Sequence, residues 1–172
     1  MIVTIGATRV TFPKSFEKWL IPALPAVTSM QIIDVDLSEA LAIDNDHVSR
    51  NGMAFILPLK QCLISLYLKN GDQEYIKNSI YCYSNFKDLL IASEKEAAEN
   101  VANLARSVLQ NGYPFGDEYI VVARAADRPG PAVLVDGKHR AAILTQHGMA
   151  RQPCVELKIN SRLPLFSWLN SP

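Results

Sequence analysis

Residues 133–142 read Val-Leu-Val-Asp-Gly-Lys-His-Arg-Ala-Ala, and this stretch decides the fold. The apolar run predicts a strand, the Asp-Gly pair a turn, and the following residues a helix that has Lys138, His139 and Arg140 in its first turn. The first N–H groups of a helix lack acceptors within it, and the helix dipole is positive there. Cations oppose that dipole, so a cationic first turn favours a bound anion such as phosphate.

A phosphate at this turn gives its residues distinct roles. Gly137 lets the backbone approach the ligand because no Cβ intervenes, and the N–H groups of the next three residues point at phosphate oxygens. Arg140 can bind the phosphate bidentately and Lys138 as a point charge. His139 can donate to the phosphate or transfer a proton near neutral pH. The alternative is that these residues form an ordinary solvated helix end, with His139 as a neutral ring that holds the turn.

Asp136 has two possible roles. Its carboxylate can cap the helix by accepting from first-turn N–H groups, which is the interpretation that the turn favours. Alternatively, it holds Mg²⁺ against the phosphate or acts as general base for an attacking hydroxyl.

Periodicity and turn residues predict the other elements. Helical spacing is found in four further stretches, namely Lys14–Leu20 before chain-breaking Pro22 and Pro25, Pro58–Asn70, Asp72–Ala92 and Ser93–Asn111. Apolar runs or alternation predict strands at Ile2–Val10, Gln31–Val35, Tyr119–Ala123, Ala132–Val135 and Cys154–Ile159.

Local signals fix several ends of these elements. Ser93 and Glu96 form a capping box that starts one helix, and Asn111-Gly112 ends it. A turn at residues 127–131 joins two strands into a hairpin. Ser38–Leu41 is expected as a helical turn capped by Asp36 or Ser38. This order of strands and helices predicts one α+β domain over residues 1–172, with a small mixed sheet and flanking helices.

The Asp-Gly-x-His-Arg core in its strand-turn-helix setting resembles the signature of the ParB/sulfiredoxin-like superfamily. The resemblance covers Tyr113–Ile159 well and Gln31–Leu41 loosely. It implies a ParB/sulfiredoxin-like fold in which the loop and helix start bind nucleotide phosphates. The connection between the first strand and the capped helix is longer here than in the family. Residues 51–92 are therefore expected to be a helical insertion, similar to those of members associated with surface-polysaccharide gene clusters.

Two departures from the family narrow its implications. Sulfiredoxins carry a cysteine where this chain has Lys138, so we expect no sulfinic-acid repair. Chromosome-partitioning members carry a Gly-Glu-Arg-Arg-type turn, so we expect no CTP-switched DNA clamp.

A second carboxylate is expected by analogy with members that phosphorylate free serine, in which the catalytic carboxylate lies outside the turn. Asp34, Asp36 and Glu39 are the candidates, because the first strand is expected beside the turn. His47 and Arg50 are candidates to line the same pocket, although a histidine in a loop is usually solvated.

Composition excludes several classes of function. The 172 residues contain 17 Lys plus Arg against 17 Asp plus Glu, so no basic surplus supports binding to nucleic acid. The most apolar stretch, Met53–Leu68, is interrupted by Pro58 and Lys60, so we expect no membrane span. Three widely spaced cysteines lack metal-ligand spacing, so we expect no metal site built by them, buried thiols and a cytoplasmic location.

The aromatic residues of the middle segment also have two interpretations. Tyr75, Tyr81, Tyr83 and Phe86 resemble a base-stacking platform, but few basic residues accompany them. Packing between helices is the favoured interpretation, and the apolar middle helices could bury a homodimer interface.

Together these features predict a small-molecule phosphotransferase. It would use ATP, ADP or CTP, with Mg²⁺, on a small metabolite or glycan precursor, and Asp136 and His139 would be its catalytic residues. A non-catalytic sensor of a nucleotide or phosphometabolite is the alternative. A ParB-like nucleic-acid-associated protein is the least favoured.

Overall fold

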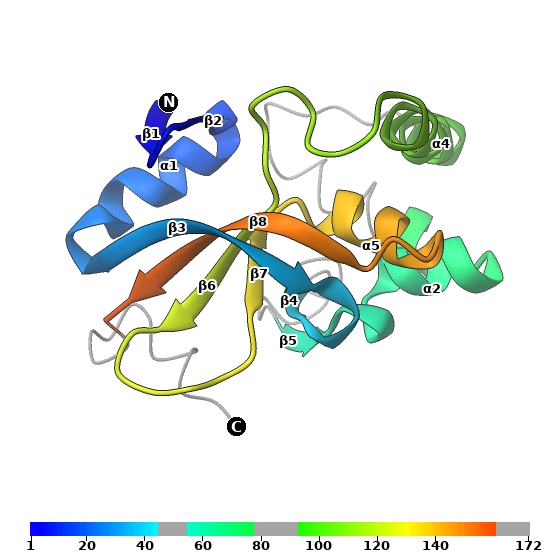
Figure 1. The fold of residues 1–172 in the computed structure, drawn as a ribbon. Coiled ribbons are helices and arrows are strands. Elements are labelled where there is room, and N and C mark those ends of the chain that lie inside the picture. Colours follow the sequence, from blue (N-terminus) through cyan, green and yellow to red (C-terminus); the bar gives the residue numbers. More distant parts are fainter. Residues whose placement is uncertain (45–54, 78–92, 161–172) are drawn as a thin grey trace.

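The computed structural model describes residues 1–44, 55–77 and 93–160, with a six-stranded β-sheet at the centre (Figure 1). From edge to edge its strands are β3 (Val27–Asp36), β8 (Arg151–Ile159), β6 (Val121–Ala125), β7 (Val133–Asp136), β4 (Leu41–Asp44) and β5 (Phe55–Pro58). Strands β8 and β6 are parallel, as are β7 and β4, and the other neighbours are antiparallel. This mixed sheet with flanking helices confirms the expected α+β class.

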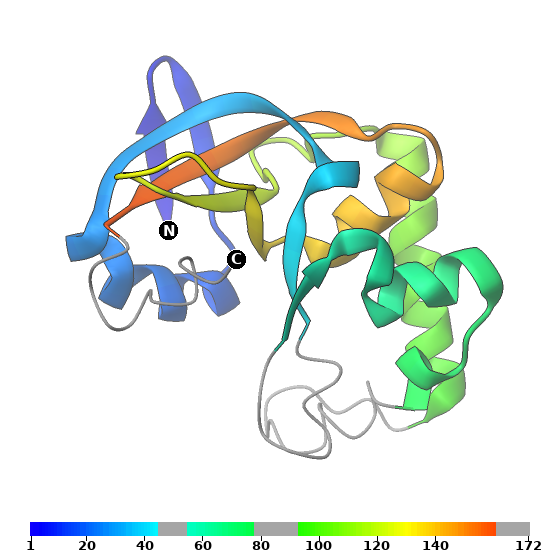
Figure 2. The same cartoon turned by 90° about the horizontal axis from the view of Figure 1, so that it is seen from below.

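The helices are distributed unevenly over the two faces of the sheet (Figures 1 and 2). Helix α1 (Lys14–Ala23) lies on one side, together with a separate hairpin of β1 (Ile2–Ile5) and β2 (Thr8–Thr11). Helices α2 (Leu63–Asn70), α4 (Glu94–Asn111) and α5 (Lys138–Gln146) lie on the other.

Side chains alternate along the central strands and so divide the core in two. Val121 and Ala123 of β6 belong to the core under α1, whereas Val122 belongs to the core under α2, α4 and α5. Val121, Val122 and Ala123 are all fully buried, so β6 lies between the two cores.

Helix α5 is buried around most of its circumference. Four consecutive residues, Ala141–Leu144, are buried, whereas an amphipathic surface helix alternates buried and exposed positions. The helix packs against both α2 and α4. It therefore lies inside the helical layer, and only its ends reach the surface.

Elements with strong local signals form where the sequence predicts them. The Ser93 hydroxyl accepts from the Glu96 N–H, and α4 ends at Asn111 before Gly112. Asp36, one of the two expected caps, accepts from the Ser38 N–H at the 3₁₀ turn Leu37–Glu39. Strands β6 and β7 form the expected antiparallel hairpin.

Other predictions need correction. The stretch predicted as one strand, Ile2–Val10, is the β1–β2 hairpin, which turns at Gly6 where φ is +61°. Helix α1 continues through Pro22 to Ala23 instead of stopping before it.

Residues 55–77 are not purely helical, although 51–92 is predicted as a helical insertion. Phe55–Pro58 forms an edge strand of the main sheet, and a 3₁₀ turn at Leu59–Gln61 precedes α2. Leu63, Ile64 and Ile76 lie in the main core. The described part of this stretch thus contributes to the sheet and to its core. Most of the second predicted helix, with Tyr81, Tyr83 and Phe86, lies outside the described residues.

Two cysteines of the described residues, Cys62 and Cys154, are buried free thiols, as expected, and Cys82 lies outside those residues. Burial raises the pKa of the Cys154 thiol to about 12. None of the helices in the described ranges is both long and apolar enough to cross a bilayer.

Candidate functional site

The predicted turn joins β7 directly to α5. Asp136 is the last residue of β7, and Gly137 occupies the N-cap position with φ +82° and ψ +20°, the left-handed region that favours glycine. The Gly137 carbonyl accepts the first helical hydrogen bond, from the Ala141 N–H at 2.9 Å. A single glycine therefore turns the chain from the sheet into the helix.

Close packing also requires glycine at position 137. A Cβ there would lie 3.0 Å from Ile120 Cγ1 and 3.3 Å from Arg140 Nη2, which is closer than ordinary van der Waals contact. The space that the sequence analysis reserves for a ligand beside Gly137 is thus filled on its Cβ side by the protein itself. A ligand must approach from the first turn of α5 instead.

Arg140 lies between two carboxylates. Its Nη2 is 3.3 Å from Asp136 Oδ2, and its Nη1 is 3.5 Å from Glu118 Oε2. Only 11% of the Arg140 side chain is exposed. The guanidinium that is predicted to bind a phosphate bidentately is thus paired with two carboxylates of the protein.

Glu118 is the second carboxylate of the site, and sequence reasoning misses it. The hairpin register contains the signal, because Val121 pairs with Asp136 and residues just before Val121 must then lie beside the turn. The Tyr113 hydroxyl holds this segment by accepting from the Ile120 N–H at 2.6 Å and donating to the Pro153 carbonyl at 2.8 Å. Nearly half of the Glu118 side chain is exposed, so the carboxylate can be reached from solvent.

The environment of Asp136 raises the pKa of its carboxyl group. Burial is the main cause, and the nearby Glu118 carboxylate adds to it, whereas Arg140 and the Gly137 N–H act in the opposite direction. Gly137, and not Asp136, occupies the N-cap position of α5. A carboxylate with a raised pKa is a stronger base than one in water.

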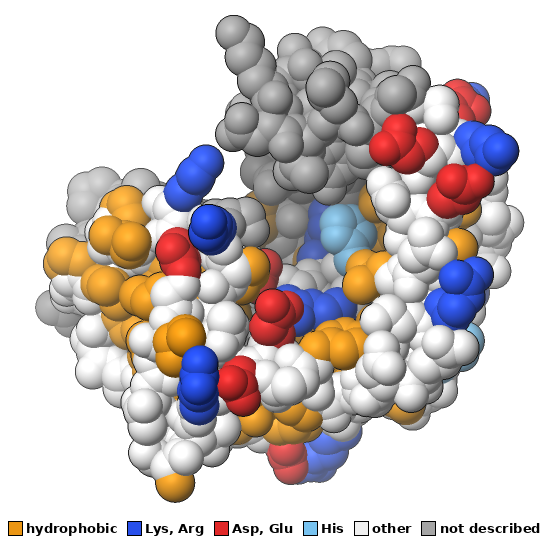
Figure 3. Space-filling model, turned by 90° about the horizontal axis from the view of Figure 1, so that it is seen from above, with side chains coloured by type: hydrophobic (Ala, Val, Ile, Leu, Met, Phe, Trp, Pro, Cys, Tyr) orange, Lys and Arg blue, Asp and Glu red, His pale blue; other side chains and the backbone are white. Residues whose placement is uncertain are grey.

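Lys138 and His139 complete the first turn of α5, and both side chains are partly exposed. His139 Nε2 lies 3.0 Å from the hydroxyl of Tyr75, a buried residue that follows α2. The face shown in Figure 3 is hollowed, and histidine, basic and acidic side chains lie together on the floor of the hollow. Such a mixture of charges can accommodate both a phosphate and a polar reacting group.

The other predicted acidic candidates lie elsewhere. Asp34 and Asp36 belong to β3, and strands β8 and β6 separate β3 from β7, so the first strand is not beside the turn. Asp36 instead bonds Ser38, and these hydrogen bonds lower the pKa of its carboxyl group. Glu39 is exposed in the turn that follows. His47 and Arg50 lie outside the described residues.

A second charged cluster occupies the same face of the sheet toward the other end of β6. Glu156 is 1% exposed, and it accepts from Gln31 Nε2 at 2.7 Å and from Arg124 Nη1 at 2.9 Å. Lys158 Nζ lies 3.7 Å from the same carboxylate. Two cations and an amide thus surround one buried anion, which is how a buried carboxylate is usually satisfied.

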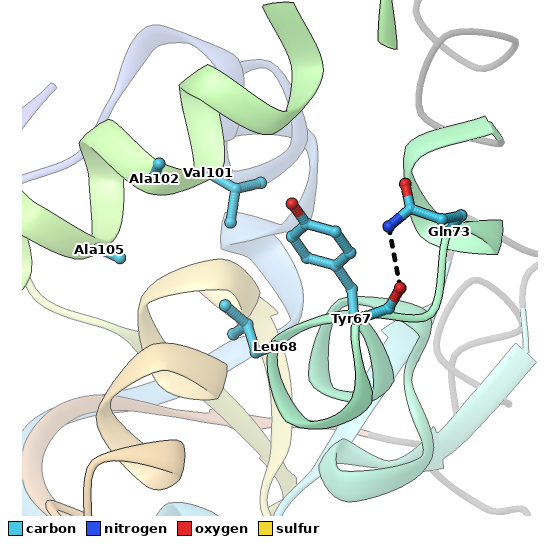
Figure 4. Close-up of a pocket in the computed structure, with 7 residues that line it drawn as sticks. Tyr67, Leu68, Gln73, Val101, Ala102 and Ala105 are labelled. Atoms are coloured by element: carbon cyan, nitrogen blue, oxygen red, sulfur yellow. Dashed lines mark hydrogen bonds between the residues drawn. The ribbon is translucent and has the colours of Figure 1, made fainter. Parts of the chain in front are cut away.

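A cavity of about 400 Å³ opens between α2 and α4 (Figure 4). Tyr67, Leu68, Val101 and Ala105 contribute most of its apolar lining, and the side chain of Gln73 is bonded to the Gly71 carbonyl. The described residues that line it carry no charge, so it does not suit a phosphate.

Within the described ranges, no group of three or more His, Cys, Asp or Glu residues is placed to hold a metal ion. Asp136 and Glu118 could still share a cation with a ligand's phosphates.

No family model, curated protein or solved structure matches this chain.

Proposed function

We propose that the chain binds a nucleotide by its phosphates at the first turn of α5 and transfers a phosphoryl group to a small hydroxyl-bearing molecule. The observation that carries the proposal is the position of Asp136. This carboxylate, whose pKa burial raises, ends a strand directly before a helix N-terminus that carries Lys138 and His139. A base beside an anion-binding helix start is the minimum that such a transfer needs.

The geometry changes the roles expected within the turn. Arg140 orients Asp136 and Glu118, so phosphate contacts fall to Lys138, His139 and the first-turn backbone. In this proposal Asp136 takes the proton of an attacking hydroxyl, a role that its raised pKa favours. The Asp-Gly-Lys-His-Arg resemblance to the ParB/sulfiredoxin-like superfamily supports this assignment of the turn to nucleotide phosphates.

Mg²⁺ fits the donors that are present. In proteins Mg²⁺ is usually bound by one or two carboxylates together with substrate phosphates. Asp136 and Glu118 supply two carboxylates, one on each side of the Arg140 guanidinium. When bound, Mg²⁺ would neutralise phosphate charge that the two carboxylates would otherwise repel.

Nucleotide binding is tested by the melting temperature of the protein and by calorimetry with ATP, ADP and CTP, each with and without Mg²⁺. Lys138→Ala should weaken binding roughly tenfold or more, because a charge-assisted hydrogen bond contributes about 1.5–3 kcal/mol. Lys95→Ala is the matched control, since Lys95 also lies in a first helical turn but is exposed and pairs with Glu99. If no nucleotide stabilises the protein, or if both variants lose binding equally, the proposal fails.

Turnover is tested separately with Asp136→Asn. This variant should keep the nucleotide binding that is measured without Mg²⁺, and it should lose transfer to hydroxyl-bearing metabolites and glycan precursors. Binding without turnover in the unsubstituted protein would identify a sensor in place of an enzyme.

A further inference from the structure

The partner of His139 comes from a distant part of the chain. Tyr75 lies 64 residues earlier, in the segment that follows α2, and its hydroxyl is 3.0 Å from His139 Nε2. The two rings meet edge-on, with centroids 5.8 Å apart and planes inclined by 69°. Only 4% of Tyr75 is exposed, and its ring also packs on Tyr67 at 5.6 Å. Tyr75 is thus fixed on one side by packing and holds the histidine on the other.

The chemistry of the two groups determines the direction of this hydrogen bond. The Tyr75 hydroxyl can donate to His139 Nε2 only when the ring is neutral, and the positive end of the α5 dipole favours the neutral ring. In a neutral imidazole one nitrogen donates and the other accepts. A phenol O–H is a better donor than a neutral imidazole N–H, and Nε2 is the better acceptor. The favoured arrangement therefore has the Tyr75 hydroxyl donating to Nε2.

We propose that Tyr75 is a positioning residue of the α5 site and that it fixes His139 as the neutral tautomer protonated on Nδ1. The proton that His139 can give is then the one on Nδ1, whichever acceptor it meets. This inference rests on the proposed function, because it assigns His139 to binding as a neutral donor to a phosphate oxygen. It also gives a reason for the hydroxyl of Tyr75, a residue buried in the main core.

The tautomer is measured directly by ¹⁵N NMR of the histidine ring in the protein without ligand. At pH values where its ring is neutral, His139 of the unsubstituted chain should be present as the Nδ1–H tautomer. Tyr75→Phe keeps the aromatic ring and removes the hydroxyl, so it should move the population toward Nε2–H. Tyr67→Phe is the matched control, because it removes a hydroxyl from the neighbouring stacked ring and should leave the His139 signals unchanged.

Binding is then measured with ATP as the probe. Tyr75→Phe should weaken ATP binding about fivefold to tenfold, the loss expected from one neutral hydrogen bond, while Tyr67→Phe should bind ATP as the unsubstituted chain does. An Nε2–H tautomer in the unsubstituted protein overturns the inference, even if Tyr75→Phe does not fold. Unchanged ATP affinity in a folded Tyr75→Phe variant also overturns it.

The two proposals fail in different ways. If the tautomer depends on Tyr75 but no nucleotide binds, the proposed function fails and the tautomer assignment stands. If nucleotide binds and the tautomer is indifferent to Tyr75, only the positioning role fails.

Discussion

The two glycines at the ends of α5 allow the packing at the site to be measured apart from backbone strain. Gly137 has φ +82° and Gly148 has φ +75°, so alanine at either position must adopt a left-handed backbone. That conformation costs an L-residue about 1–2 kcal/mol. Replacing glycine also reduces the conformational entropy of the unfolded chain, which stabilises the folded protein by about 0.4–1 kcal/mol at either position.

The surroundings of the two glycines differ. A Cβ at Gly148 meets nothing within 4 Å, whereas a Cβ at Gly137 lies 3.0 Å from Ile120 Cγ1 and 3.3 Å from the Ile120 backbone. Inserting a methyl group into packed surroundings typically costs a further 1–3 kcal/mol or so. Gly148→Ala should therefore destabilise the protein by about 1 kcal/mol or less, and Gly137→Ala by about 2–4 kcal/mol.

Urea unfolding followed by circular dichroism measures both free energies of unfolding. For a chain of this size, 1 kcal/mol corresponds to about 2–4 °C in melting temperature, so thermal scans provide an independent check. Gly137→Ala should also reduce nucleotide binding, because the new Cβ displaces the Arg140 guanidinium that holds both carboxylates. Equal destabilisation by the two substitutions would refute the close packing of Gly137 against Ile120.

Two further predictions concern charge. The pKa of Asp136 is raised above its unfolded value of 3.8, so its stabilising contribution is complete below that pH and is lost as the pH rises through the folded pKa. As the pH rises from 4 to 8, the free energy of unfolding of Asp136→Asn, measured with urea, should therefore increase relative to that of the unsubstituted protein. A difference that stays constant or decreases would contradict the burial of this carboxyl group. Glu156→Ala leaves Arg124 and Lys158 without their anion and should cost about 3 kcal/mol, whereas Glu99→Ala, which breaks an exposed pair, should cost less than about 1 kcal/mol. Similar losses in these two variants would show that the Glu156 cluster contributes little.

The elements that the sequence predicts are those specified by neighbouring residues. The Ser93–Glu96 capping box and Gly112 fix the ends of α4 because each acts within one helical turn. The Asp-Gly turn likewise predicts the strand-to-helix junction at Gly137. In these places the local preference and the tertiary fold agree.

The errors occur where distant contacts decide the outcome. Strands β4 and β5 are four residues each and carry no clear alternation, so their place beside β7 depends on pairing across the sheet. The position of β3 at the far edge is also a matter of strand order, which one sequence does not determine. Glu118 and Tyr75 reach the site through the hairpin register and helix packing, and neither has a local signal of function.

The burial of α5 limits how far the helix can move when a ligand binds. Helix α5 cannot shift as a whole without disturbing the main core, because Ala141–Leu144 are buried in it. Under the proposed function, the N–H donors at its start would be largely in position before a nucleotide binds, and little further conformational entropy would be lost on binding. Recognition of this kind would select molecules that match the spacing of these donors, and adaptation to different substrates would come from the more exposed side chains around them.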